Sequence, residues 1–363
     1  MGSSSRFLTG HRLADHQVLH HISSGGMGDV CVARKIGRRG RSSLVALKIP
    51  HPHLASDPRY VSMLLDEAAV TRRSDHPNVV KTLGFRTDAR HGFHIVMEHV
   101  EGVSLGALLS HARKSRRELP APVCLRILRD VLSGLAAAHA ATGEDGKPLS
   151  LVHRDVCPSN IHVGSDGRTR LLDFGIADAK GRRCDSREGF VLGKLSYMAP
   201  ERVFSKGADS RMDLFSCGAV LRESFSGERL FSGTDVDRIG EELGASPQRI
   251  AQLSGPLRPL VGLLRIAVSV EPEHRFQSAA EFIAGIDEIA PQVGGVATHH
   301  EVADTVDAIA GDRLRADLAR ISASVRRLDT LRRSPKSSPI ASIWATPGGR
   351  RRPDGGHSYS NGA

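Results

Sequence analysis

The sequence predicts an α+β protein with two lobes, in which a small antiparallel β-rich lobe with one key helix precedes a larger helical lobe. Between residues 16 and 50, short apolar stretches alternate with turns rich in Gly, Ser and Arg, which is typical of a twisted antiparallel sheet. Residues 59–73 have apolar side chains near helical spacing, and residues 79–86 and 93–100 return to strand character. After Ser104, helical periodicity dominates and predicts helices over residues 123–140, 213–225, 257–270 and 279–289.

We divide the 363 residues into four parts. They are a flexible N-terminal lead (1–15), a folded domain (16–290), an amphipathic helical extension (296–333) and a basic disordered tail (334–363). Within the folded domain, the N-lobe covers about 16–97 and the C-lobe about 103–290, joined by residues 98–102.

The extension carries six aliphatic residues spaced by threes and fours, which places one apolar stripe along a helix. These residues are Leu314, Leu318, Ile321, Val325, Leu328 and Leu331. Such a stripe either packs onto the preceding domain or forms a short coiled coil in a homodimer through residues 314–331. We favour the first interpretation, because barely three heptads are present.

Charge suggests a nucleic-acid partner at first sight, since the formal net charge is +10. Half of this excess lies after residue 330, where six basic residues face one acid in a segment rich in Pro, Gly and Ser. Such a segment cannot bury enough apolar surface to fold. Because no recognition helix, zinc spacing or RNA-binding aromatic pattern is present, we do not expect nucleic acid as the partner.

The chain has the features of a cytoplasmic protein. Its five cysteines form no CxxC pair, which favours free thiols over a disulfide framework or a zinc ribbon. The 18 histidines form no metal-ligand motif. The longest apolar run, residues 259–270, is too short for a membrane span and contains Arg265. Residues 1–10 lack the apolar core of a secretory signal.

Two motifs in the β-rich half indicate phosphate binding. The first is a glycine-rich stretch between two expected strands, where backbone N–H groups can approach phosphates because no Cβ blocks them. It comprises Ile22, Ser23, Ser24, Gly25, Gly26, Met27, Gly28, Asp29 and Val30. The second is Val45-Ala46-Leu47-Lys48, which places one lysine on a strand. Glu67, in the following helix, is a candidate partner for that ammonium group.

The helical half contains a sharper pattern. The segment His153-Arg154-Asp155-Val156-Cys157-Pro158-Ser159-Asn160 places an aspartate and an asparagine five residues apart. Asp173-Phe174-Gly175 begins thirteen residues after Asn160. Asn160 and Asp173 offer the hard oxygen ligands that Mg²⁺ prefers. Asp155 is suited to accept a proton from an attacking hydroxyl, which is what phosphoryl transfer requires.

These motifs, in this order, resemble those of the bacterial eukaryotic-like serine/threonine protein kinases. The match covers about residues 16 to 290 and includes Ala199-Pro200-Glu201. The resemblance implies the bilobal protein kinase fold, Mg-ATP as phosphoryl donor with Mn²⁺ as an alternative metal, and protein substrates that accept the γ-phosphoryl group on serine or threonine. It identifies Lys48, Glu67, Asp155, Asn160 and Asp173 as catalytic residues.

The resemblance also assigns structural and nucleotide-binding roles. By this resemblance, residues 98–100 form the hinge that binds adenine. Met97 precedes the hinge, and Glu98 and Val100 are among the residues that contact the nucleotide. Asp213 becomes a buried aspartate that braces the catalytic loop. Arg275 becomes the partner of Glu201.

Three positions depart from the family pattern. Ser23 replaces the first glycine of the phosphate loop, Cys157 replaces the usual catalytic-loop lysine, and Lys194 stands where a threonine is usual. We predict that the last two are coupled: Lys194 supplies the positive charge that Cys157 no longer does, which adds Lys194 to the catalytic residues. The alternative is that Lys194 points into solvent.

Two regions suggest regulation, and one alternative reading concerns the whole domain. Ser186 is the only hydroxyl side chain between Gly175 and Gly193, and its phosphate could dock on Arg154. The tail contains three Ser-Pro or Thr-Pro pairs around Trp344, which suggests a docking or autophosphorylation segment. A pseudokinase scaffold is the main alternative to an active enzyme, although Lys48, Asp155, Asn160 and Asp173 are all present.

Overall fold

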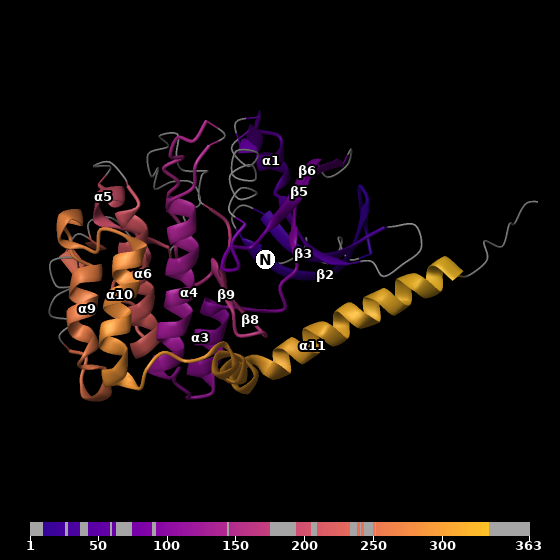
Figure 1. Ribbon diagram of the computed structural model, residues 1–363. Helices are drawn as coiled ribbons and strands as arrows, with labels where there is room; N and C mark the ends of the chain where they lie inside the picture. Colours follow the sequence, from indigo (N-terminus) through magenta and orange to yellow (C-terminus); the bar gives the residue numbers. More distant parts are fainter. Residues whose placement is uncertain are drawn as a thin grey trace, which may run out of the picture.

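A computed structural model gives the architecture of the chain. It describes residues 10–25, 28–36, 43–58, 60–62, 75–88, 92–143, 145–174, 194–204, 209–232, 238–239, 241–242, 250 and 252–333. Figure 1 shows a β-rich lobe beside a larger helical lobe, with the long helix α11 extending from the helical lobe past the sheet. The predicted α+β, two-lobed architecture is therefore confirmed.

The N-lobe is built on an antiparallel sheet of six strands in the order β1-β2-β3-β4-β6-β5. The strands are β1 (Arg12–Leu13), β2 (His16–Gly25), β3 (Gly28–Lys35), β4 (Leu44–Pro50), β5 (Thr82–Asp88) and β6 (Gly92–Glu98). A short helix, α1 (Pro52–Ala55), follows β4. The alternating apolar residues of the strands bury one side of the sheet in a core around Leu47, which is 0% exposed.

The first strand lies within residues 1–15, which the sequence predicts to be a flexible lead. The flexible lead was predicted to reach residue 15, but Arg12 and Leu13 pair with Gln17 and His16 as strand β1. Leu13 is fully buried in the N-lobe core. Two residues are too few to show a strand period, so this edge strand left no pattern to read.

The C-lobe is helical, with a second small sheet at its junction with the N-lobe. This sheet contains β7 (Gly102–Ser104), β8 (Ile161–Gly164) and β9 (Thr169–Leu171). The α-helices are α3 (Leu105–Lys114), α4 (Ala121–His139), α5 (Pro200–Val203), α6 (Arg211–Ser226), α9 (Leu260–Ala267) and α10 (Ala279–Ile289). Single 3-10 turns are η3 (Leu195–Tyr197), η4 (Gly255–Leu257), η5 (Pro272–His274) and η6 (Ala290–Val293).

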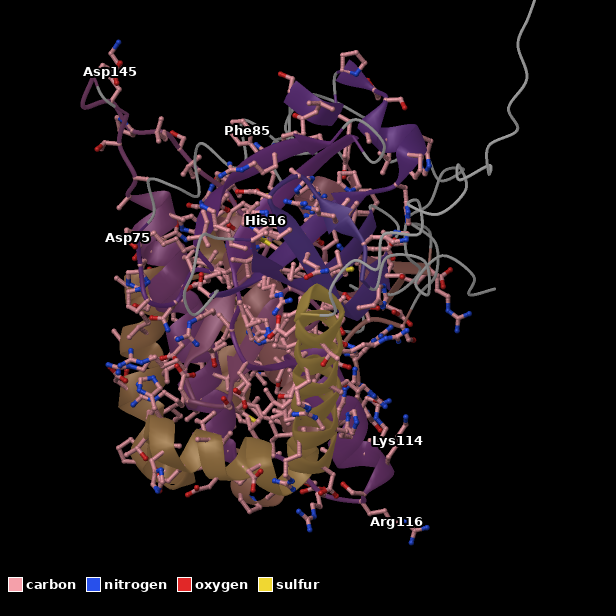
Figure 2. All side chains as sticks on the ribbon, turned by 90° about the vertical axis from the view of Figure 1, so that its right-hand side faces the viewer. His16, Asp75, Phe85, Lys114, Arg116 and Asp145 are labelled. Carbon is pink, nitrogen blue, oxygen red and sulfur yellow. The ribbon has the colours of Figure 1, made fainter. Side chains whose placement is uncertain are left out.

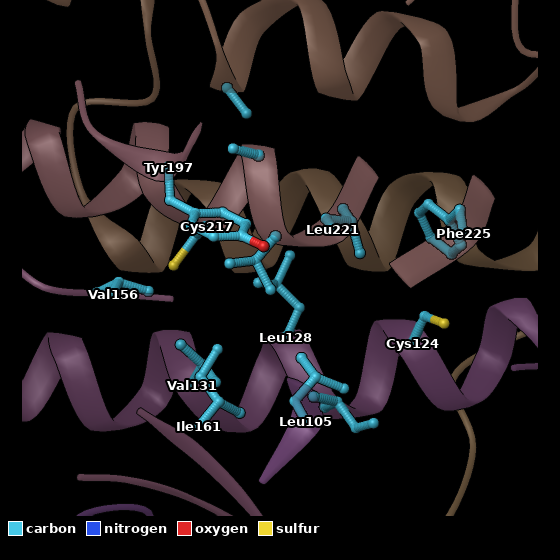
Figure 3. Packing of buried hydrophobic residues seen from close by; sticks show 14 of the residues in the cluster. Leu105, Cys124, Leu128, Val131, Val156, Ile161, Tyr197, Cys217, Leu221 and Phe225 are labelled. Carbon is cyan, nitrogen blue, oxygen red and sulfur yellow. The ribbon is translucent and has the colours of Figure 1, made fainter. Parts of the chain in front are cut away.

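Helices α4 and α6 form the centre of the C-lobe. In Figure 3, Leu128 and Val131 of α4 lie opposite Cys217 and Leu221 of α6, and all four are at most 2% exposed. Gly218 lets α6 approach α9 closely, because a Cβ at this position would lie 2.7 Å from the Ala267 side chain. The buried faces of α4 and α6 therefore share the C-lobe core, and α9 packs closely against α6.

The C-terminal helix α11 (His299–Arg333) connects the two lobes. Near its start it contacts α3 and α4, and further along it contacts β2 of the N-lobe. Figure 2 shows it passing over one face of the molecule from the helical lobe up to the sheet. The predicted apolar stripe is used within the chain, since Ile321 packs against Leu19 and Val32 with Val325 and Leu328 beside them. A homodimer through residues 314–331 stays a prediction.

Two helices are shorter than predicted. The helix expected to start at 296 begins at His299, and the helix expected over 257–270 spans only Leu260–Ala267 after the separate turn η4. Among the described residues, no helix is both long and apolar enough to cross a bilayer. The predicted disordered tail, 334–363, lies outside the described residues.

Candidate active site

The loop between α4 and β8 brings two predicted site residues together. Asn160 donates from Nδ2 to the main-chain oxygen of Asp155 at 2.9 Å and to its Oδ2 at 2.7 Å. Because both hydrogens of this amide are used, its carbonyl oxygen is the atom left to hold a further ligand. Asn160 is 8% exposed, so its amide is fixed by burial as well as by hydrogen bonds.

A buried carboxylate from α6 holds the start of this loop. Asp213, which is 0% exposed, accepts hydrogen bonds from the backbone N–H of His153 at 2.7 Å and of Arg154 at 2.8 Å. Its Oδ2 also lies 2.9 Å from Nε2 of His139. These bonds hold Arg154 at φ +65°, which is unfavourable for a residue with a Cβ. The predicted bracing role of Asp213 agrees with this geometry.

Asp173 follows β9 and faces the N-lobe lysine. Its Oδ1 lies 3.0 Å from Nζ of Lys48, and its own φ is +47°. The preceding residue, Leu172, makes two hydrogen bonds to the catalytic loop. Its backbone N–H donates to the main-chain oxygen of Asn160, and its main-chain oxygen accepts from Nε2 of His153, each at 2.9 Å. The Asp173 carboxylate is therefore held close to Asp155 and Asn160 by the main chain.

Lys194, at the start of turn η3, forms an ion pair with Oδ2 of Asp155. Burial acts to lower the pKa of the Lys194 ammonium, but the Asp155 carboxylate and, less strongly, the Asp173 carboxylate outweigh it, so the pKa is raised. Lys194 is therefore charged at neutral pH. Its side chain is 30% exposed and points to the carboxylate, so the solvent-facing alternative does not fit.

Cys157 lies on the other side of Asp155. Its Sγ is 3.9 Å from Asp155 Oδ1 and 3.1 Å from the Ser159 hydroxyl, and the residue is 2% exposed. Burial, together with the Asp155 charge, raises the pKa of this thiol to about 11. The position where a lysine was expected is thus filled by a small neutral group.

The predicted adenine contacts form one apolar cluster. Ala46 of β4 pairs with Met97 of β6, and both are 8% exposed. Val100 and Leu172 pack against the same cluster from the junction and from the C-lobe. A planar apolar ligand is therefore expected to lie between the lobes here. Glu98 is engaged elsewhere, since its backbone N–H donates to the Lys81 oxygen and its carboxylate accepts from the Lys81 N–H.

The glycine-rich stretch forms the tip of the β2–β3 hairpin, where Gly25 pairs with Gly28. A Cβ on Gly28 would lie 2.2 Å from the Ile49 oxygen, so this glycine is required by the close approach of β4. Side chains also close the hairpin, because Ser24 and His21 both bind Oδ1 of Asp29. Ser23 and Val30 pair across it, and Ile22 is 42% exposed.

Several predicted residues cannot be placed. Four of them lie outside the described residues: Gly26 and Met27 of the glycine-rich stretch, Glu67 as the expected partner of Lys48, and Ser186. The predicted pairing of Arg275 with Glu201 is present, because the guanidinium donates to both carboxylate oxygens at 2.7 Å. The side chain of Arg275 is 0% exposed.

Sequence reasoning missed two supporting residues. His153 contacts Phe174 with ring centroids 4.7 Å apart, besides its bond to Leu172. Arg202 donates to the main-chain oxygen of Arg154, which ties the segment after η3 to the catalytic loop. Neither contact follows from a spacing in the sequence, because each joins residues about 20 or more positions apart.

The site fits a magnesium ion bound together with phosphates. Among the described residues, no group of three or more His, Cys, Asp or Glu side chains could hold a metal alone. Mg²⁺ usually takes one or two protein oxygens and completes its shell with water and substrate phosphate oxygens. The Asn160 carbonyl oxygen and the Asp173 carboxylate meet that requirement, since the Asn160 nitrogen is committed to Asp155.

Comparison with known proteins agrees with this geometry. Residues 16–285 match the family described as the protein kinase domain. The tyrosine-protein kinase MasK of Myxococcus xanthus is 36% identical over 277 residues, which cover 74% of this chain and 42% of MasK. The serine/threonine-protein kinase PknL of Mycobacterium tuberculosis is 33% identical over 251 residues, covering 69% of this chain and 60% of PknL.

The fold has solved counterparts as well. The crystal structure of the Mycobacterium tuberculosis PknI kinase domain superimposes with a TM-score of 0.54 at 25% identity, covering 80% of this chain and all of that domain. The chain spans between about two fifths and three fifths of the length of the two curated relatives above.

Proposed function

The chain belongs to the protein kinase family, and from this premise we propose that it transfers the γ-phosphoryl group of Mg-ATP to serine or threonine hydroxyls of proteins. The observation that supports this most strongly is the constellation of Lys48, Asp155, Asn160 and Asp173. Lys48 forms an ion pair with Asp173, Asn160 donates two hydrogen bonds to Asp155, and the backbone bond from Leu172 to Asn160 links the two pairs at the junction of the lobes.

The proposed reaction assigns one role to each group. The hydroxyl oxygen forms a bond to the γ-phosphorus, and the bond from that phosphorus to the bridging oxygen breaks, with its electron pair leaving on ADP. The hydroxyl proton passes to Asp155. Oδ2 of Asp155 is held by Asn160 and Lys194, whereas Oδ1 has only the Cys157 thiol near it, at 3.9 Å, among the described residues. Oδ1 is therefore the oxygen assigned to the substrate hydroxyl.

The remaining site residues bind and orient the nucleotide. Lys48 binds its phosphates, held in place by Asp173. Asn160 and Asp173 would hold Mg²⁺, which supplies charge neutralisation for the phosphates, and Mn²⁺ would suit the same oxygen ligands. The Ala46, Met97 and Val100 cluster takes the adenine, while the β2–β3 hairpin, from Ile22 to Val30, covers the phosphates. Glu67 is assigned to orient Lys48.

The acceptor residue needs a direct test, because one relative is named a tyrosine kinase and another a serine/threonine kinase. We expect phosphoserine and phosphothreonine when the purified chain is incubated with labelled ATP, Mg²⁺ and a mixed peptide library. Asp155→Asn should abolish the label, whereas Asp312→Asn, on the exposed face of α11, should leave it unchanged. Label found only on tyrosine would replace the serine/threonine assignment.

The same experiment tests the scaffold alternative. A pseudokinase would bind partners without transferring phosphate, so wild-type and Asp155→Asn protein would incorporate equally little label. Lys48→Met should behave like Asp155→Asn, with the exposed Lys147→Met as its matched control. We assign the reaction to the cytoplasm, where Mg-ATP is abundant and where the free thiols of Cys31, Cys124, Cys157 and Cys217 would persist.

A further inference from the structure

Resting on the proposed function, we propose that Lys194 is a catalytic residue, which brings the second ammonium group of the phosphoryl-transfer site from the η3 segment. The ion pair between its Nζ and Oδ2 of Asp155 places this charge at the proposed base. Asp173 also contributes to raising the pKa of Lys194, so the ammonium lies within electrostatic reach of both carboxylates. It is the arrangement expected of a group that faces the transferring phosphate.

The charge balance of the site depends on this residue. Among the described residues, Lys48 is paired with Asp173 and Lys194 with Asp155. Removal of Lys194 would leave Asp155 without its ammonium partner and would make the site more negative where it faces an anionic nucleotide. Cys157 cannot make up the difference, because a thiol whose pKa is about 11 is neutral at physiological pH.

Space within the site supports the same conclusion. Cys157 lies on the Oδ1 side of Asp155, and Lys194 reaches Oδ2 from a different segment, 39 residues further along the chain. A lysine has a long flexible stem with a compact charge at its end, so its Nζ can move from Asp155 towards a bound phosphate by changing rotamer. The 30% exposure of the Lys194 side chain leaves room for that movement.

The position of Lys194 depends on how the segment that leads into Ala199-Pro200-Glu201 is held. Lys194 immediately precedes η3, whose Tyr197 is buried in the C-lobe core, and Arg202 ties the same segment to the catalytic loop at Arg154. The charge is therefore delivered by the segment that leads into Ala199-Pro200-Glu201. Displacement of this segment would remove the ammonium from the site together with it.

The first test compares Lys194→Gln and Lys194→Arg, since neither adds bulk that the partly exposed position could not hold. Removing one electrostatic contact to a developing charge typically costs 10²–10³-fold in kcat, and we expect about this loss for Lys194→Gln. The KM for ATP should change little, and Lys194→Arg should retain most of the activity. Lys147→Gln, at an exposed surface lysine, is the matched control.

The second test moves the charge back to the catalytic loop. Cys157→Lys combined with Lys194→Gln should recover at least tenfold in kcat over Lys194→Gln alone. Cys157→Lys by itself should lower activity, because two ammonium groups would then crowd one carboxylate. Thermal unfolding of each variant establishes that it is folded. If the double variant is folded and no faster than Lys194→Gln, or if Lys194→Gln keeps wild-type kcat, the proposal is wrong.

A binding measurement separates this proposal from a purely structural role for Lys194. Lys194→Gln should weaken the binding of Mg-ADP with aluminium fluoride, a mimic of the transferring phosphoryl group, far more than that of Mg-ADP alone. Equal weakening of both ligands would mean that Lys194 only holds the segment in place. Absence of phosphoryl transfer in the wild type would instead refute the proposed function, so the two failures are distinguishable.

Discussion

Helix α11 provides the sharpest test of the packing, because one side chain carries much of its contact with the N-lobe. Ile321 is 6% exposed and packs against Leu19 of β2 and Val32 of β3, each 1% exposed. An ion pair lies near this contact, with Arg34 Nη1 2.8 Å from Asp329 Oδ1. We predict that Ile321→Ala destabilises the docking of α11 on the sheet.

The magnitude follows from the burial. Replacing a buried isoleucine by alanine costs about 2–5 kcal/mol, depending on how far the site can collapse. One helix lies here on the sheet, and Val325 and Leu328 are only partly buried, so the lower end, about 2 kcal/mol, applies. If α11 unfolds together with the domain, the unit contains more than 300 residues, and this corresponds to a fall in Tm of about 3 °C.

Differential scanning calorimetry measures the Tm, and hydrogen exchange over residues 317–333 measures the docking itself. Ser322→Ala is the matched control, since Ser322 is the exposed neighbour of Ile321. We also expect a higher KM for ATP in Ile321→Ala, because β2 leads directly into the hairpin at Gly25. If Ile321→Ala matches Ser322→Ala in both Tm and exchange, the reasoning about α11 is wrong.

Three further predictions concern the supports of the site. Asp213→Asn should lower stability by about 1–3 kcal/mol and reduce kcat, because the amide has one acceptor oxygen and can accept from only one of the two backbone N–H groups that Asp213 binds; chemical denaturation and steady-state rates measure both effects. Glu201→Ala should destabilise by about 3–5 kcal/mol by leaving the buried guanidinium of Arg275 unpaired, and the double change with Arg275→Met should recover much of that loss in urea unfolding. Burial lowers the pKa of His162 to about 4, so the unfolded chain binds a proton that the native site excludes. The corresponding stability is fully present above about pH 6.5 and is lost as the pH falls towards 4. At pH 5 this loss is about 2 kcal/mol, and it should be absent from His162→Gln; equal pH dependence of the unfolding free energy in both proteins would contradict the assignment.

Local sequence patterns were sufficient to predict the catalytic loop and the order of the elements. Asp155 and Asn160 lie five residues apart in one loop, so their contact is a local property that spacing can reveal. Hydrophobic periodicity identified α10 with its observed bounds, Ala279–Ile289. Periodicity could not predict β1, because its two residues contain no repeat. It predicted a helix longer than α9, because the separate turn η4 precedes that helix.

Motif order and hydrophobic patterning therefore indicated the family, the two-lobed order of the elements and the chemical groups proposed for phosphoryl transfer. Which of these groups meet depends on the packing of the whole chain. Lys48 and Asp173 lie 125 residues apart, and Lys194 and Asp155 lie 39 apart, yet each pair is in contact. The stripe of α11 likewise predicted an apolar face, but only the fold showed that it covers β2 and β3. Periodicity specifies which side of an element is buried, whereas the partner depends on how all the elements pack together.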